Sequence, residues 1–301
     1  MRRLLTAALI ALLPLDAAAE DPALPGIADS GLIEANGIRH YYEVRGQGEP
    51  FLLLHGGLGS SDMFAPVLPQ LAEGRQVILV DLHGHGRTEL GERPMRYEAM
   101  ADDMAAILDA LGHEKIDVMG YSLGGGVALR LAIQHPERVD RLALVSAGYA
   151  HDALFPEILE QVTRLGGQMA PMMQDTPMYK GYVAVAPDPD AFPDLLDRLG
   201  ELERQPFDWS DEVRALRMPV LLAYGDSDMI RPEHAVDFYQ LLGGGLRDAG
   251  WQREHMAQNR LAILPGLTHY DTFLSPETVR VTRGFLDGRQ TRSDWAAPAQ
   301  N

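Results

Sequence analysis

Six short apolar runs recur along the 301-residue chain, and each is followed by glycine, polar or charged residues. They read "PFLLLHGG", "QVILVDLHGHG", "KIDVMGYS", "RLALVSAG", "PVLLAYGDSD" and "RLAILPGLTH". The apolar positions are continuous rather than alternating, which is typical of strands covered on both faces. The runs therefore predict parallel strands in the interior of a sheet.

A hairpin and several helices complete the pattern. "LIEANGIRHYYEVRG" predicts two strands joined by a two-residue turn at Asn36 and Gly37. "YEAMADDMAAILDAL" has apolar residues at three- and four-residue spacing, as in an amphipathic helix. "LGGGVALRLAIQHP" predicts a helix that Pro136 ends, and "PETVRVTRGFLDG" predicts a last one. Because strands and helices alternate, we expect an α/β fold with a doubly wound, mostly parallel sheet of about eight strands.

The alternation is interrupted between residues 151 and 210. This stretch has helical patterns and several prolines but no comparable strand-like run, and it is too long for a structureless loop. We therefore expect a helical cap at 151–210, inserted into a core formed by residues 30–150 and 211–288. A second, shorter insertion is expected at 241–259.

Two further expectations concern the cap and the C-terminus. The methionines of the cap favour core packing over a ligand surface, because Met adapts to irregular gaps. They are Met169, Met172, Met173 and Met178. Residues 289–301 are expected to form a flexible tail.

The first 19 residues have the layout of a cleavable secretory signal. Arg2 and Arg3 precede an apolar stretch over residues 4–15, and small alanines end at Ala19. About a dozen apolar residues interrupted by Pro14 are too few to span a bilayer, and no later segment is long and apolar enough. We expect residues 1–19 to be a signal peptide and the protein to be exported, to a periplasm or to the medium.

Composition excludes several classes of function. The chain has 43 acidic and 26 basic residues, so its surface repels phosphate backbones and nucleic acid is not an expected partner. It contains no cysteine, which excludes disulfides, thiolate metal ligands and a cysteine nucleophile. Oligomeric state is not readable from these features.

Chemically useful side chains follow the ends of the predicted strands. In a parallel sheet these carboxyl ends share one edge, where ligands bind. The residues expected there are His55, Asp81, His83, His85, Ser122, Asp226, Asp228 and His269. They include a hydroxyl, carboxylates and imidazoles, the groups that nucleophilic catalysis needs.

Ser122 lies between small residues. A serine on a strained strand-to-helix turn needs small neighbours two residues away on either side, because a Cβ there would collide across the turn. Gly120 and Gly124 meet this requirement. Gly125 and Gly126 are expected to let the following helix approach the sheet closely.

Five stretches, in order, resemble the α/β-hydrolase family, of the small-molecule esterase and lactonase type. They are "LLLHGGLGSS", "VILVDLHGHGRT", "VMGYSLGG", "LLAYGDSDMI" and "LPGLTHY", and the resemblance extends from about residue 30 to 288. It implies that Ser122 is the nucleophile, Asp228 the acid and His269 the general base. The order serine, acid, histidine is that of such folds. The amides of Leu123 and, by the resemblance, Gly57 are expected to form the oxyanion hole.

Alternatives remain for two of these positions. Asp226 is the rival acid, although the family's spacing from Gly225 favours Asp228. Leu58 is a second choice for the amide of Gly57. The sequence "SAG" at 146–148 offers no acid after the preceding strand, which removes the placement that some relatives use.

The remaining histidines are expected to be structural. His55 is expected to hydrogen-bond its own loop, and His234 and His255 are expected on the surface. His83 and His85 beside Asp81 could ligate zinc, but no further ligand pattern accompanies them. We therefore expect neither a metal nor a cofactor.

The predicted activity is hydrolysis of a carboxylic ester or lactone through an acyl-enzyme. The cap shows no cluster of Arg or Lys, so a small, largely neutral substrate is expected. The resemblance leaves carbon–carbon bond hydrolysis and cofactor-free perhydrolase or haloperoxidase chemistry open on the same scaffold. A non-catalytic protein that holds an apolar ligand under the cap is the alternative of a different class.

Overall fold

The computed structural model describes residues 23–289. The predicted signal peptide and, apart from Arg289, the predicted tail lie outside the described residues. The strands are β1 (Ile27–Ala35), β2 (Ile38–Gly46), β3 (Glu49–Leu54), β4 (Arg75–Val80), β5 (Ile116–Tyr121), β6 (Val139–Val145), β7 (Val220–Ser227) and β8 (Arg260–Thr268). The α-helices are α1 (Leu68–Leu71), α2 (Tyr97–Ala110), α3 (Leu123–Gln134), α4 (Pro156–Thr163), α5 (Ala170–Met173), α6 (Pro177–Val185), α7 (Phe192–Glu203), α8 (Ser210–Ala215), α9 (Pro232–Leu241) and α10 (Pro276–Leu286). Short 3₁₀ turns are η1 (Ser61–Phe64), η2 (Pro136–Arg138), η3 (His151–Ala153), η4 (Gly167–Met169), η5 (Pro189–Ala191) and η6 (Thr272–Leu274).

The described strands form one sheet in the order β1-β2-β4-β3-β5-β6-β7-β8. Strands β3 to β8 pair in parallel, whereas β2 pairs antiparallel with both β1 and β4. Asn36 and Gly37 make the hairpin turn with φ of 51° and 83°, the left-handed conformation that a two-residue turn requires. The predicted fold class, a doubly wound and mostly parallel sheet, is confirmed.

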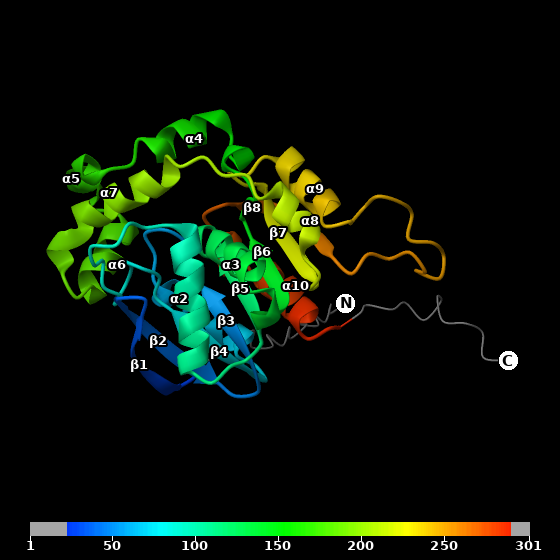
Figure 1. Ribbon diagram of the computed structural model, residues 1–301, viewed down its shortest axis with the longest axis horizontal. Coiled ribbons are helices and arrows are strands. Elements are labelled where there is room, and N and C mark those ends of the chain that lie inside the picture. The colour runs from blue at the N-terminus through cyan, green and yellow to red at the C-terminus, as the bar shows by residue number, and fades with distance from the viewer. Residues whose placement is uncertain (1–22, 290–301) are drawn as a thin grey trace, which may run out of the picture.

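Successive residues of each central strand pack on opposite faces, which explains their continuous apolarity. In β3, Leu52 and Leu54 join the core beneath α2, α3, α8 and α9, whereas Phe51 and Leu53 join the core beneath α1 and α10. Figure 1 shows α2 and α3 in front of the strands and α10 on their far side. Both faces of the sheet are therefore covered by helices.

Helices α4 to α7 form a layer above the carboxyl edge of the sheet (Figure 1). The segment leaves and re-enters the core at one point, where Ala150 and Asp208 make an antiparallel bridge. The amide of His151 donates to the carbonyl of Phe207 at 2.9 Å, and that of Trp209 donates to Tyr149 at 3.0 Å.

The methionines of this segment divide into two pairs. Met169 and Met173 are half-buried against the core, as predicted. Met172 and Met178 are 75% and 41% exposed, so core packing was the wrong interpretation for them. The short helices α5 and α6 pack against α7 and each other on one side only, which leaves their outer sides to solvent.

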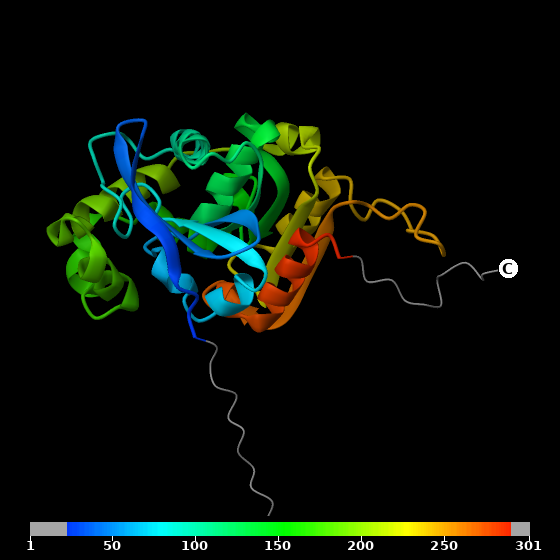
Figure 2. The same cartoon turned by 90° about the horizontal axis from the view of Figure 1, so that it is seen from below.

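The second insertion runs between α9 and β8. It meets the sheet at the start of β8, where Arg260 pairs with Leu221, whereas Thr268 at the other end of β8 pairs with Ser227. The Asn259 side chain closes its base by accepting from the Val220 amide at 2.8 Å and donating to the Leu242 carbonyl at 2.6 Å. Figure 2 shows this loop extending away from the body. It therefore lies at the amino edge of the sheet. Within residues 23–289 no helix is both long and apolar enough to cross a bilayer.

The turn from β5 to α3 explains the glycines around Ser122. Ser122 has φ of 53° and ψ of −120°. A Cβ on Gly120 would lie 2.2 Å from the carbonyl oxygen of Gly124, across the turn as predicted. A Cβ on Gly124 would instead lie 2.4 Å from the carbonyl oxygen of His55, after the neighbouring strand β3. The glycines therefore serve both the turn and the packing of α3 on β3.

Gly125 and Gly126 each leave space for a different neighbouring residue. A Cβ on Gly125 would lie 2.5 Å from the Cβ of Ala147, just beyond β6, which agrees with a close helix-to-sheet approach. A Cβ on Gly126 would lie 2.5 Å from the ring of Tyr97, at the start of α2. Gly126 therefore makes room for a helix rather than for the sheet.

The Gly120→Ala variant is expected to lose at least about 3 kcal/mol of unfolding free energy, because the new methyl group meets backbone atoms that cannot yield locally. Urea unfolding measures the loss. Gly284→Ala is the control, since a Cβ at that position in α10 meets no atom within 4 Å and should stabilise the helix by up to about 1 kcal/mol. Equal stability of the two variants would contradict the steric account.

Candidate active site

Three predicted residues meet at the carboxyl edge of the sheet. Ser122 follows β5, Asp228 follows β7 and His269 follows β8. The Oγ atom of Ser122 lies 3.0 Å from Nε2 of His269, and Nδ1 of the same ring lies 2.8 Å from Oδ1 of Asp228. A hydroxyl, an imidazole and a carboxylate thus form one hydrogen-bonded chain.

The Asp228 carboxylate is buried and accepts several hydrogen bonds from protein groups. Burial acts to raise the pKa of the Asp228 carboxyl, but hydrogen bonds from His269, Ser146 and the Ile230 amide hold that pKa below its ordinary value. The Ser146 hydroxyl donates to Oδ2 at 2.5 Å, and the Ile230 amide donates to Oδ1 at 3.2 Å. Because an ionised carboxylate only accepts, Nδ1 of His269 carries a proton and Nε2 is free to accept one.

Asp226, the rival acid, points elsewhere. It is exposed, and its Oδ1 accepts from the Gly266 amide at 2.9 Å and from the Ser227 hydroxyl at 3.3 Å. These contacts join the ends of β7 and β8. The structure therefore brings Asp228, and not Asp226, to the imidazole of His269.

Three residues that the sequence analysis did not single out hold this site. The Tyr121 hydroxyl donates to the His269 carbonyl at 2.7 Å, and its ring lies 5.3 Å from the imidazole. The Thr272 hydroxyl reaches the same carbonyl at 3.2 Å. Ser146 holds Asp228. Tyr121 precedes Ser122 and could have been considered from its place in the motif, but single hydroxyls such as Ser146 and Thr272 carry no sequence pattern.

Gly57 and Leu123, whose amides are expected to bind an oxyanion, lie beside each other. Leu123 is the first residue of α3, so its amide has no acceptor within the helix. A Cβ on Gly57 would lie 3.9 Å from the Cβ of Leu123. In residues 23–289 neither amide makes a hydrogen bond. Leu58 follows in the same turn, with φ of 58°, and its amide stays a second choice.

This arrangement is suited to nucleophilic chemistry. An imidazole whose Nδ1–H is fixed by a carboxylate can take the hydroxyl proton through Nε2. Unpaired amides, such as that of Leu123 at the start of α3, can donate hydrogen bonds to the negative charge that develops on a carbonyl oxygen.

The histidines of the neighbouring loops bind backbone groups. The Leu82 amide donates to Nε2 of His55, whose Nδ1 faces the Gly56 carbonyl at 2.8 Å, in agreement with the predicted structural role. Nε2 of His83 lies 2.6 Å from the Leu90 carbonyl oxygen. Nδ1 of His85 lies 2.9 Å from the His83 carbonyl oxygen.

Asp81, the third member of the considered metal set, does not meet these rings. Its carboxylate accepts from the amides of Ser61 and Arg87, at 2.7 and 2.8 Å. Among the residues that the structure describes, no group of three histidine or carboxylate side chains is placed to hold a metal ion.

Known proteins are similar to this chain in sequence. A family described as having the alpha/beta hydrolase fold matches residues 49–170. RutD of Azorhizobium caulinodans, named as a carbamate hydrolase, is 32% identical over 224 residues, which cover 69% of this chain and 83% of that protein.

The chain belongs to the α/β-hydrolase family.

Other similarities of this α/β-hydrolase are more partial. A protein of Pseudomonas sp. named 2-hydroxymuconate semialdehyde hydrolase is 41% identical over 121 residues, which cover 38% of this chain and 43% of that protein. The crystal structure of carboxylesterase CesB from Bacillus subtilis superposes with a TM-score of 0.67 at 19% identity, over 86% of this chain and 92% of that one. At that identity the likeness shows the fold alone.

The surface placement predicted for His234 was wrong, whereas His255 is exposed as predicted. His234 is only 3% exposed in this α/β-hydrolase. Its ring stacks on Tyr149 at 4.2 Å, and its Nε2 accepts from the Tyr149 amide at 3.2 Å. The third residue of α9 faces the core, which the polar surroundings of the sequence did not reveal.

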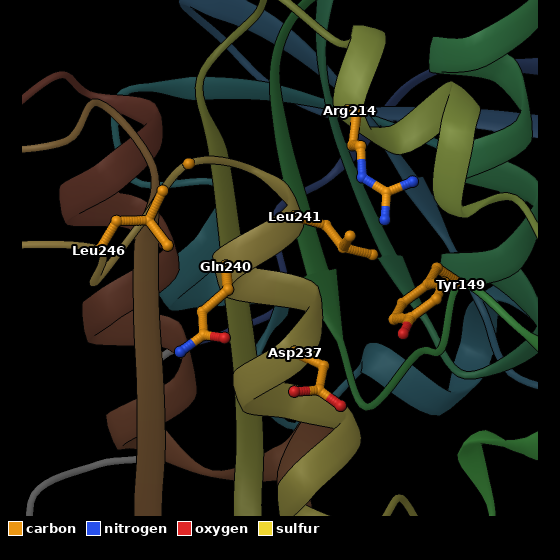
Figure 3. Close-up of a pocket in the computed structure, with 7 residues that line it drawn as sticks. Tyr149, Arg214, Asp237, Gln240, Leu241 and Leu246 are labelled. Carbon is orange, nitrogen blue, oxygen red and sulfur yellow. The ribbon is translucent and has the colours of Figure 1, made fainter.

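A hollow of about 440 Å³ lies between α8 and α9 (Figure 3). Its lining residues are Tyr149, Arg214, Asp237, Gln240, Leu241, Gly243 and Leu246. None of the three residues of the hydrogen-bonded chain lines it. The candidate active site of this α/β-hydrolase is therefore separate from the hollow.

The stability of this α/β-hydrolase should fall as pH decreases from about 6.5 to about 4. Burial lowers the pKa of His234 to about 4. Between pH 6.5 and pH 4 the imidazole is therefore protonated in the unfolded chain and neutral in the folded chain. The loss at pH 4 is about 3 kcal/mol from this residue. Urea unfolding from pH 7 to 4 should give a shallower slope for His234→Gln than for the parent.

Phe238→Leu is the control for that comparison. Phe238 is fully buried beside Tyr149 and His234, and its truncation lowers stability by about 1 kcal/mol without removing a titrating group. Its slope with pH should match the parent. A parent slope retained in His234→Gln would exclude the assignment to this histidine.

Proposed function

We propose that the protein is a serine hydrolase that cleaves a carboxylic ester or lactone of a small, largely neutral substrate through an acyl-enzyme. The observation that carries this proposal is the hydrogen-bonded chain from Ser122 through His269 to Asp228, at 3.0 and 2.8 Å. Membership of the α/β-hydrolase family supports it, although the fold by itself does not choose the reaction.

In the first half of the reaction, the Ser122 oxygen attacks the carbonyl carbon and its proton passes to Nε2 of His269. The amides of Leu123 and Gly57 donate hydrogen bonds to the negatively charged carbonyl oxygen. The tetrahedral intermediate then expels the alcohol oxygen, which takes the proton from Nε2. Asp228 keeps the ring oriented and stabilises its cation.

In the second half, water replaces the alcohol. Nε2 of His269 takes a proton from this water, whose oxygen attacks the acyl carbon of the ester to Ser122. Collapse returns the proton to the Ser122 oxygen and releases a carboxylic acid. In a lactone the released alcohol and acid belong to one molecule, so ring opening follows the same steps.

The cations of the cap support a neutral substrate. Arg164 pairs with Glu160, Arg198 lies 3.7 Å from Glu201, and Arg204 donates to backbone carbonyls of the cap at 3.2 Å. Lys180 is exposed and lies 3.9 Å from Asp175. These contacts engage the positive charges within the cap and do not form a clamp for an anionic substrate.

Carbon–carbon bond hydrolysis is the second candidate. It is favoured by the 41% identity to the relative named 2-hydroxymuconate semialdehyde hydrolase. The relative named as a carbamate hydrolase adds carbamates to the carbonyl compounds worth testing. A panel of esters of increasing acyl length, lactones, carbamates and vinylogous diketones distinguishes these classes.

The Ser122→Ala variant should lose at least about a thousandfold in kcat for p-nitrophenyl acetate or butyrate, because the acyl group has no oxygen to bind to. A fluorophosphonate probe should label the parent at Ser122 and leave the variant unlabelled. A folded variant with undiminished turnover would overturn the proposal. Absence of labelling in the parent would favour a non-catalytic binding protein.

The two aspartates provide a matched comparison for the acid. Asp228→Asn should lower kcat by about a thousandfold or more, since the amide can donate to Nδ1 and favour the wrong tautomer of His269. Asp226→Asn should stay within about threefold of the parent because its carboxylate does not contact the ring. The reverse ranking would assign the acid to Asp226.

We also propose that residues 1–19 direct export. This rests on the basic, apolar and small-residue segments of the sequence. Expressed in a bacterial host, the chain should be recovered from the periplasm or medium with Glu20 at its N-terminus, and a variant lacking residues 2–19 should stay in the cytoplasm. An uncleaved chain in the cytoplasm would contradict export.

A further inference from the structure

Backbone strain gathers at the edge of the sheet that carries the site. Five residues other than glycine have positive φ within residues 23–289: Asn36, Leu58, Ser122, Ser146 and Arg253. Asn36 lies in the hairpin turn and Arg253 in the second insertion. The other three lie where β3, β5 and β6 end. Strain at such positions points to a functional constraint.

Ser146 has the same positive φ as Ser122 and follows the next strand of the sheet. Its φ is 52°, against 53° for Ser122. The Ser122 amide donates to the Val145 carbonyl at 3.0 Å, and the Ser146 amide donates to the Ala223 carbonyl at 2.9 Å. Both serines thus leave the sheet at the same register, and both have a positive φ.

Contacts of the next residue, Ala147, hold the backbone of Ser146 in place. The carbonyl of Ala147, the next residue, accepts from the Tyr224 hydroxyl at 2.8 Å. The methyl group of Ala147 occupies the space that Gly125 leaves. The backbone at Ser146 is therefore fixed from both β7 and α3, so the direction of its side chain is fixed as well.

The Ser146 side chain is directed at the carboxylate of Asp228. It is 1% exposed, and its Oγ lies 2.5 Å from Oδ2. The other oxygen, Oδ1, faces the imidazole of His269 at 2.8 Å. In the described part of the chain, Ser146 is the one side chain that donates to Oδ2, and the Ile230 amide donates to Oδ1, so both groups favour the orientation in which Oδ1 faces the imidazole.

Thr272 connects this contact to the loop that carries His269. Its hydroxyl lies 3.1 Å from Oγ of Ser146 and also reaches the carbonyls of Thr268 and His269. Thr272 is fully buried. The ends of β6, β7 and β8 are thereby joined by side-chain hydroxyls beneath the site.

We propose that Ser146 is a positioning residue for the reaction: its hydroxyl holds the Asp228 carboxylate so that one oxygen meets the imidazole of His269. This inference rests on the proposed function. Ser146 does not touch the substrate or the reacting atoms, and its effect passes through Asp228.

The variants Ser146→Ala and Ser146→Gly test the proposal, because both lack the hydroxyl but differ in backbone strain. Loss of a hydrogen bond to a charged group should lower kcat/KM about ten- to a hundredfold in both. The loss should appear in kcat, with KM within about threefold, since the substrate makes no contact with Ser146.

The pH profile separates positioning from a purely structural role. Without the hydroxyl, the Asp228–His269 pair loses a donor that stabilises its deprotonated form. The acid limb of kcat/KM should therefore move to higher pH, by up to about one unit. Thr282→Val is the control, because it removes a fully buried hydroxyl of α10 and should change neither kcat/KM nor the limb.

Fluorophosphonate labelling separates the possible failures. A parent that is not labelled at Ser122 would remove the proposed function. A labelled parent with Ser146→Ala and Ser146→Gly labelled at the parent rate, and with an unmoved acid limb, would overturn the inference alone. Activity retained in Ser146→Gly but lost in Ser146→Ala would assign the effect to backbone strain and would also overturn it.

Discussion

The parallel pairing of β5, β6, β7 and β8 fixes where Ser122, Ser146, Asp228 and His269 lie, because each follows the end of one of these strands. Parallel strands in register bring such ends to one edge without any direct attraction between the side chains. The backbone hydrogen bonds between the strands therefore bring these four residues to the same edge of the sheet. The local contacts have only to orient groups that are already neighbours.

Close packing at this edge depends on small residues. Gly120 and Gly124 let the chain reverse sharply and bring α3 onto β3, so the first amide of α3 lies beside the turn that contains Gly57. A helix start with unpaired amides and a strand end with a hydroxyl thereby occupy the same place. The positive φ angles of Leu58, Ser122 and Ser146 are held by the packed structure around them.

Much of this architecture could be predicted from the sequence. Continuous apolar runs identify central strands because burial on both faces demands them, and the Asn36–Gly37 pair identifies the hairpin. The family resemblance selects Ser122, Asp228 and His269 as the candidate site residues, and the structure brings these three together.

Other features depend on tertiary contacts that a linear pattern does not contain. His234 lies in a polar stretch, yet its ring stacks on Tyr149 from another part of the chain. The sequence "SAG" lacks an acid and was therefore set aside, although Ser146 binds the acid supplied by β7. Met172 and Met178 are apolar residues in a layer too thin to bury both sides of its helices.

The insertion of residues 151–210 between two neighbouring points of the core constrains the positions of its two ends and not its length. The chain leaves and re-enters the core through residues that are paired with each other, Ala150 and Asp208. Lengthening, shortening or replacing the segment between them leaves the distance that it must bridge unchanged, and the added entropy of closing a longer segment grows only slowly with length. The layer formed by α4 to α7 can therefore change in length or sequence without moving the strand ends that carry Ser122, Asp228 and His269.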